Sequence, residues 1–132
     1  MGSQEMSCLH AADVLREKCA ASQRKAMDGD NVEPALLEVL NWLKAHPQCH
    51  KEFADVLLST ISEQADRLDV PWELLPFCMR ELRWPEIQAG LARALDEAVR
   101  RNDWRAIPIF SSGLEAYEPE WNDADLFEYY RR

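Results

Sequence analysis

The densest group of side chains capable of chemistry is the segment His46-Pro47-Gln48-Cys49-His50. Imidazole nitrogens and thiolates are ligands that zinc prefers, but a structural zinc site needs about four of them in a tetrahedral arrangement. The further ligands would have to come from Cys8-Leu9-His10, and no pair has the spacing of a zinc finger. We therefore expect a turn between two helices here. A metal-binding or enzymatic protein that uses His46, Cys49 and His50 is kept as an alternative.

Other catalytic patterns do not fit the sequence. Cys49 and His50 are adjacent and would point apart on a helix, which disfavours a Cys–His nucleophile pair. A di-iron site in a helical bundle requires Glu three residues before His, where this chain has Ser7, Leu43 and Pro47. The four glycines are isolated, so we expect no phosphate-binding loop. The sequence thus predicts a protein that is not an enzyme and that uses no metal and no cofactor.

A second unusual group lies near the end of the chain, where carboxylates alternate with aromatic rings. Residues 106–132 hold six acidic and two basic residues. Helix capping accounts for Asp123 and Asp125, which leaves the loop from Tyr117 to Trp121 unexplained. Carboxylates and rings together suit a basic partner, through charge complementarity, buried area and cation–π contacts. The predicted partner-binding residues are Tyr117, Glu118, Glu120, Trp121 and Asp125.

The five tryptophans are many for a chain of this length. Trp72, Trp84 and Trp104 lie at expected helix starts, where a large ring would pack the helix ends together, so we expect them in the core. Trp121 lies between Pro119 and a polar cap, outside any apolar stripe, and is the strongest candidate for a contact residue. The same acidic and aromatic segment would also serve to cover the end of its own bundle, and this alternative stays open.

Helices must position all these residues, because apolar side chains recur at helical spacing and no run of alternating β-branched residues is found. Helices are expected at about 8–25, 32–46, 48–70, 71–82, 85–101, 104–117 and, as a short seventh, from 123. The connections are short, so consecutive helices should be antiparallel neighbours. The pattern predicts an all-α fold of six to seven helices, as a helical bundle or a short solenoid.

Residues 74–95 resemble a single HEAT-like repeat. The likeness lies in a helix that begins Leu74-Leu75-Pro76, a turn at Trp84-Pro85-Glu86 and a second helix rich in alanine and leucine. HEAT arrays are protein-binding scaffolds, so the resemblance implies a short HEAT-like solenoid with a binding role. It covers 22 of 132 residues and assigns a role to no individual residue.

Length and composition predict one folded helical domain over residues 1–132. The 47% apolar content excludes a disordered chain, and no apolar run is long enough to cross a bilayer. Residues 1–5 show no secretory signal and are expected to be disordered or a remnant of cloning, with Met6 as an alternative start. The net charge of −9 argues against nucleic acid and anionic membranes as partners.

The four cysteines, Cys8, Cys19, Cys49 and Cys78, are widely spaced in a chain large enough to fold without cross-links. We expect buried, reduced thiols and a cytoplasmic protein. Together these observations predict a small acidic helical protein that binds a basic protein partner, in the manner of an inhibitor or immunity protein. A structural subunit that forms a homodimer is a further alternative.

Overall fold

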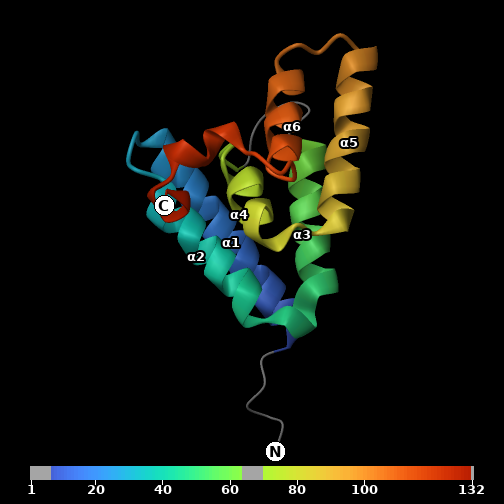
Figure 1. Ribbon diagram of the computed structural model, residues 1–132. Coiled ribbons are helices and arrows are strands. Elements are labelled where there is room, and N and C mark those ends of the chain that lie inside the picture. The colour runs from blue at the N-terminus through green and yellow to red at the C-terminus, as the bar shows by residue number, and fades with distance from the viewer. Residues whose placement is uncertain (1–6, 64–69, 132) are drawn as a thin grey trace, which may run out of the picture.

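The computed structural model describes residues 7–63 and 70–131, and this part of the chain is helical without strands (Figure 1). The α-helices are α1 (Cys8–Met27), α2 (Glu33–Ala45), α3 (His50–Glu63), α4 (Leu74–Leu82), α5 (Pro85–Arg100) and α6 (Ala106–Glu115). Short 3-10 helices are η2 (Pro47–Cys49), η3 (Asn122–Leu126) and η4 (Glu128–Tyr130). The predicted all-α fold is confirmed. None of the described helices is both long and apolar enough to span a membrane.

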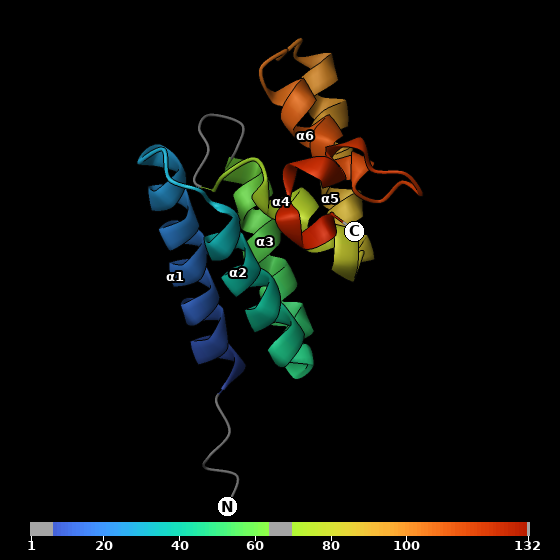
Figure 2. The same cartoon turned by 60° about the vertical axis from the view of Figure 1, so that its left-hand side comes forward.

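The helices form a two-layered bundle (Figures 1 and 2). Helices α1 and α2 pack together, as do α5 and α6. The odd-numbered helices contact one another in chain order, and so do the even-numbered ones, from α2 through α4 to α6. In Figure 1 the α5–α6 hairpin extends beyond the other helices, while the chain after α6 crosses back over α4 towards α2.

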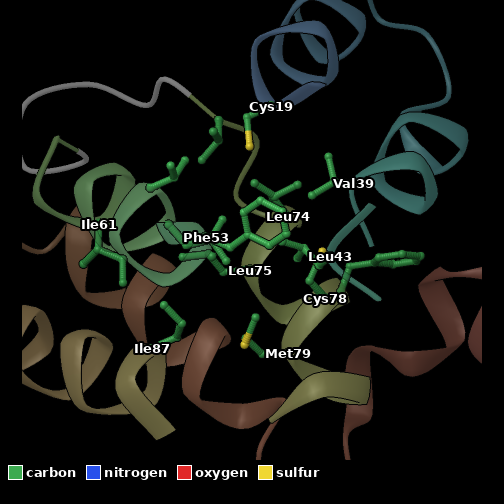
Figure 3. Packing of buried hydrophobic residues seen from close by; sticks show 14 of the residues in the cluster. Cys19, Val39, Leu43, Phe53, Ile61, Leu74, Leu75, Cys78, Met79 and Ile87 are labelled. Carbon is green, nitrogen blue, oxygen red and sulfur yellow. The ribbon is translucent and has the colours of Figure 1, made fainter. Parts of the chain in front are cut away.

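Helix α4 is the centre of the core, because its first six residues, Leu74 to Met79, are all buried. A short helix that is apolar on every side must be surrounded by other elements. Figure 3 shows Leu74, Leu75 and Met79 among buried side chains of the neighbouring helices, including Phe53. Helix α4 therefore lies inside the bundle, packed against α2, α6 and the rings of the chain after α6.

The observed start of α4 differs from the sequence expectation. The helix begins at Leu74 and not at Pro71, and the backbone N–H of Leu74 donates to the Pro71 carbonyl at 3.1 Å in the turn before it. Pro76 therefore lies in the first helical turn, where its missing N–H costs no hydrogen bond and no kink is needed. The preceding helix was expected to run to residue 70; Val70 lies in a bend, and residues 64–69 are outside the described part of the chain.

The segment that resembles a HEAT-like repeat corresponds to α4, the turn at Trp84 and most of α5. The two helices of such a repeat pack against each other as one unit. Here α5 instead packs most closely with α6 and then with α3, while α4 packs with α2 and α6. The likeness therefore does not mark a repeat of this fold. The expected seventh helix is replaced by η3 and η4.

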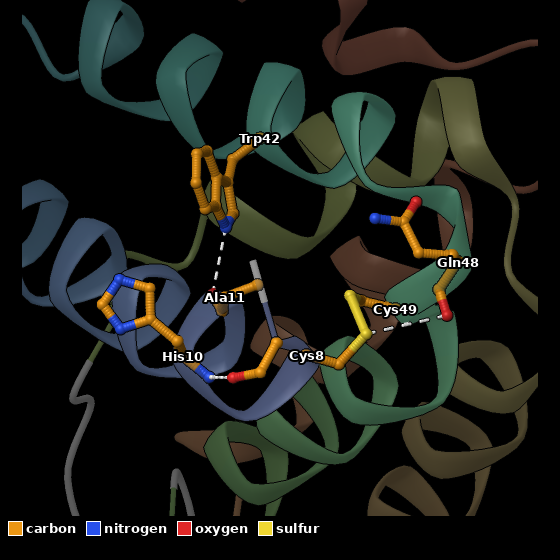
Figure 4. The surroundings of a disulfide bond; sticks show 7 residues. Cys8, His10, Ala11, Trp42, Gln48 and Cys49 are labelled. Atoms are coloured by element: carbon orange, nitrogen blue, oxygen red, sulfur yellow. Dashed lines mark hydrogen bonds between the residues drawn. A yellow bond between two sulfur atoms is a disulfide. The ribbon is translucent and has the colours of Figure 1, made fainter. Parts of the chain in front are cut away.

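The cysteines correct a second expectation. Cys8 and Cys49 form a disulfide, although 41 positions separate them in the sequence (Figure 4). The expectation of reduced thiols is wrong for this pair, because the α1–α2 hairpin and the η2 turn bring residue 49 back to the start of α1. Cys19 and Cys78 are free and buried, as expected. Burial raises the pKa of the Cys19 thiol to about 12.

Candidate partner-binding surface

The predicted partner-binding residues lie in residues 116–131, which we call the closing segment because it folds back over α4 and α2 (Figure 1). Its conformation depends first on Arg80 of α4. One guanidinium nitrogen of Arg80 donates to the carbonyl oxygens of Ala116 at 3.1 Å and Glu118 at 2.5 Å. The other donates to the carbonyl oxygen of Pro119 at 3.1 Å. One cation thus binds three backbone carbonyls of the closing segment.

Arg83 and Tyr117 fasten the start of the same loop. Arg83 donates from its guanidinium to the Tyr117 carbonyl at 3.2 Å. The Tyr117 hydroxyl donates to the Trp84 carbonyl at 2.8 Å. Burial, and secondarily the nearby Glu86 carboxylate, raises the pKa of Tyr117 well above its usual value. Tyr117 therefore acts as a neutral, half-buried anchor of the loop, with little of its ring left for a partner.

Trp121 is buried, with 5% of its surface exposed. Its ring stacks on Phe127 with centroids 5.7 Å apart and meets Tyr130 edge to face at 5.3 Å. The guanidinium of Arg80 lies 6.0 Å from the centroid of the indole ring. Sequence reasoning placed Trp121 at the surface, and the structure corrects that placement. The expected cation–π contact exists, but its cation belongs to the same chain.

The far end of the closing segment is tied down as firmly. The Glu33 carboxylate, at the start of α2, accepts hydrogen bonds from the backbone N–H groups of Glu128 at 3.0 Å and Tyr129 at 2.7 Å. The Tyr129 hydroxyl donates to Glu81 at 2.6 Å, and this bond, with burial, raises the pKa of Tyr129. The Tyr130 hydroxyl donates to the Phe77 carbonyl. The segment is therefore an integral part of the bundle.

The glutamates of this region are exposed, whereas its aromatic rings are buried or partly buried. Glu118 and Glu120 are exposed and line a surface hollow of about 440 Å³, together with Glu115, Pro119 and Asn122. We call these five residues the acidic hollow. Ion pairs occur elsewhere in the described chain, but none of them includes Glu115, Glu118 or Glu120. Arg80 and Arg83 donate their hydrogen bonds to backbone carbonyls of the closing segment instead.

The structure thus brings together only part of the predicted set. Asp125 is exposed, but it lies in η3 and outside the lining of the acidic hollow. Glu115 belongs to the hollow and was missed, because it looked like an ordinary solvated position at the end of α6. Its signal in the sequence is the three-residue spacing from Glu118, which keeps both on one side of a helix end.

The alternative site at His46, Cys49 and His50 has lost its thiolate, because the Cys49 sulfur is bonded to Cys8. The His46 ring packs on Trp42, with centroids 4.2 Å apart. The His50 ring lies 4.1 Å from that of Trp84, and its Nε2 is 2.5 Å from a Glu86 carboxylate oxygen.

Across the described residues, no group of three or more potential ligands is placed to hold a metal ion. Comparison of the chain with protein-family models, with curated proteins and with solved structures finds no match in any of the three.

Proposed function

We propose that this protein is a small cytoplasmic interaction protein that binds a basic protein partner through the acidic hollow, as an inhibitor or immunity protein would. The observation that carries the proposal is that Arg80 binds the backbone of the closing segment and leaves the nearby carboxylates unpaired. Its guanidinium donates hydrogen bonds to backbone carbonyls, while the carboxylates of Glu118 and Glu120 stay exposed and without an ion pair in the described chain.

A rigid loop strengthens such a surface. Arg80 and Arg83 hold the backbone of residues 116–119, so the carboxylates are presented without a large ordering cost on binding. An arginine or lysine of the partner would enter the hollow and pair with Glu115, Glu118 or Glu120. Charge complementarity of this kind raises the association rate and discriminates against acidic competitors.

A fluorescent arginine-rich peptide is a suitable probe, titrated by anisotropy at low and at physiological salt. The variant Glu118→Lys/Glu120→Lys should bind at least tenfold more weakly than the parent chain, and the loss should shrink as salt is added. The control Glu17→Lys/Glu38→Lys makes the same charge change on α1 and α2, where these carboxylates are 71% and 69% exposed.

The control variant separates a local surface from the general acidity of the chain. Affinity within about twofold of the parent is expected for Glu17→Lys/Glu38→Lys, because those positions lie on other helices. Equal weakening by the two variants would mean that the peptide senses only net charge, and the acidic hollow would then have no special role.

A second candidate function, self-association, is favoured by one observation. The Trp104 ring is 72% exposed at the tip of the α5–α6 hairpin. Exposed tryptophan is common at the centre of protein interfaces. Sedimentation equilibrium over a hundredfold range of concentration tests it: a homodimer that the variant Trp104→Ser abolishes would support a structural subunit, and a monomer throughout would remove this candidate.

A further inference from the structure

The Cys8–Cys49 disulfide joins the amino-terminal ends of two helices (Figure 4). Cys8 is the first residue of α1, a helix of 20 residues, and Cys49 immediately precedes α3, a helix of 14 residues. The amino-terminal end of a helix carries partial positive charge and favours a thiolate. At both cysteines the helix end therefore contributes a favourable interaction with a thiolate.

The two cysteine residues differ in exposure. Cys49 is fully buried, whereas Cys8 is only partly buried at the edge of the bundle. Thiol–disulfide exchange requires an incoming thiolate to approach one sulfur in line with the S–S bond. An external thiol can therefore attack Cys8, which makes Cys49 the leaving group.

The surroundings of each sulfur suit these roles. Burial opposes the departure of a Cys49 thiolate, while the partial positive charge at the start of α3 favours it. The carbonyl oxygen of Gln48 lies 3.8 Å from Cys8 Sγ (Figure 4). That oxygen disfavours a Cys8 thiolate, but it can accept the proton of a Cys8 thiol once the bond has been reduced.

The fold does not depend on the bond to hold α1 in place. Ala11, Ala12 and Leu15 of α1 are buried in the core. The indole N–H of Trp42 also donates to the Ala11 carbonyl at 3.0 Å, which fastens α1 to α2 (Figure 4). Reduction should therefore release the first turn of α1 and the η2 turn while the bundle persists.

We propose that Cys8 and Cys49 form a reversible redox switch, opened by a dithiol protein reductant that attacks Cys8. In the first step the reductant's thiolate bonds to Cys8 Sγ, the Cys8–Cys49 bond breaks and Cys49 leaves as a thiolate that then takes up a proton. In the second step the reductant's other thiol displaces Cys8, which also becomes a thiol. The chain gains two electrons and two protons, and the reductant becomes a disulfide.

This inference is independent of the acidic hollow, which lies at the other end of the described chain. It also accounts for a cross-link in a protein that we propose to be cytoplasmic. Lasting disulfides are rare in reducing compartments, and those found there are usually transient or redox-sensing.

The order of attack can be tested by trapping. A thioredoxin-type reductant whose second active-site cysteine is replaced by Ser should form a stable mixed disulfide with the folded, oxidised chain. Peptide mapping by mass spectrometry should locate the adduct at Cys8 and leave Cys49 as a free thiol. An adduct at Cys49, or one that forms only in denaturant, would overturn the proposal.

Hydrogen exchange provides the second measurement. In the reduced chain the amides of residues 9–12 and 48–50 should exchange at least tenfold faster than in the oxidised chain, while those of α4 keep their protection. Unchanged exchange at all these positions would mean that the bond is no switch. Loss of protection in α4 as well would make the bond a requirement for folding, which also contradicts the proposal.

Discussion

The closing segment and the tip of the α5–α6 hairpin, residues 101–105, each hold a tryptophan, but the two side chains differ in burial. In the closing segment Trp121 is 5% exposed, whereas at the tip Trp104 is 72% exposed. Both tryptophans follow a helix and lie beside polar residues. The difference lies in their neighbours: Trp121 packs on Phe127 and Tyr130 and lies near Arg80 of α4, while the tip extends beyond the other helices (Figure 1). The burial of each tryptophan ring is thus determined by its tertiary neighbours rather than by its local sequence.

Local hydrogen bonds shape the tip instead. After α5 the backbone of Asn102 adopts a left-handed conformation, with φ 55°. Asn102 N–H donates to the Val99 carbonyl and Asp103 N–H to the Ala98 carbonyl, a pattern that ends helices and reverses the chain. Asp103 then accepts from Ala106 N–H at 3.3 Å and caps α6. The tip can therefore form without tertiary contacts of Trp104.

The largest difference between the two regions should appear when each tryptophan is removed. We expect Trp121→Ala to lower the free energy of unfolding by about 3–5 kcal/mol, because it empties a buried ring site. Trp104→Ala should change it by less than about 0.5 kcal/mol, because the ring is exposed. Urea denaturation followed by circular dichroism measures both. Similar losses for the two variants would break the comparison.

The next largest difference is expected between Arg80, which binds the closing segment, and Arg105, which lies in the tip. Arg80→Ala should cost about 1.5–3 kcal/mol, since charge-assisted hydrogen bonds to three carbonyls are lost and those groups are left without a partner. Arg105→Ala, in the exposed tip, is the matched control and should stay within about 0.5 kcal/mol. Thermal or urea unfolding decides the matter, and an unaffected Arg80→Ala variant would show that the closing segment is held by its rings alone.

Alkaline pH should loosen the closing segment and leave the tip intact. Burial raises the pKa of Tyr117 and Tyr130 above the usual value of 10. Their stabilising contribution is therefore complete below about pH 10 and is lost as pH rises further. Stability measured between pH 8 and 11 should fall at the top of this range. The variant Tyr117→Phe/Tyr130→Phe should flatten that fall, and an unchanged slope would assign it to other groups.

The smallest effect is expected from the cap at the tip. Asp103→Ala removes the side-chain acceptor of the Ala106 N–H and keeps the Asp103 carbonyl, which accepts from the same N–H at 3.1 Å, so it should cost about 0.5–1 kcal/mol. Hydrogen exchange at the first turn of α6 should accelerate, whereas the amides of residues 128 and 129, held by Glu33, should not respond. A response at both places would show that the two regions are coupled.

Much of the fold was predictable, because helical periodicity and capping are local signals. The apolar residues at helical spacing in α2 are buried at Leu36, Leu40 and Leu43 and partly buried at Leu37. Those of α5 are buried at Ile87, Leu91 and Ala98 and partly buried at Ala94 and Leu95. The predictions that were wrong concerned features that depend on contacts between distant parts of the chain.

Trp104 and Trp121 exchanged their expected environments, and the Cys8–Cys49 bond joins residues 41 positions apart. Of the candidate site, the exposed carboxylates of Glu118 and Glu120 could be identified from composition. The role of Arg80 could not, because its three acceptors lie 36 to 39 positions further along the chain.

The bonds from Glu33 to residues 128 and 129 have a consequence for how the chain matures. They span 95 and 96 positions. The Glu33 carboxylate at the start of α2 can therefore form these bonds only after nearly all of the described sequence has been synthesised. A growing chain that has reached only α6 leaves Phe77 without Phe127, Tyr129 and Tyr130, the rings that pack on it. Until then the Phe77 side of α4 is exposed, and apolar surface exposed during synthesis is prone to aggregate and is a target for chaperones.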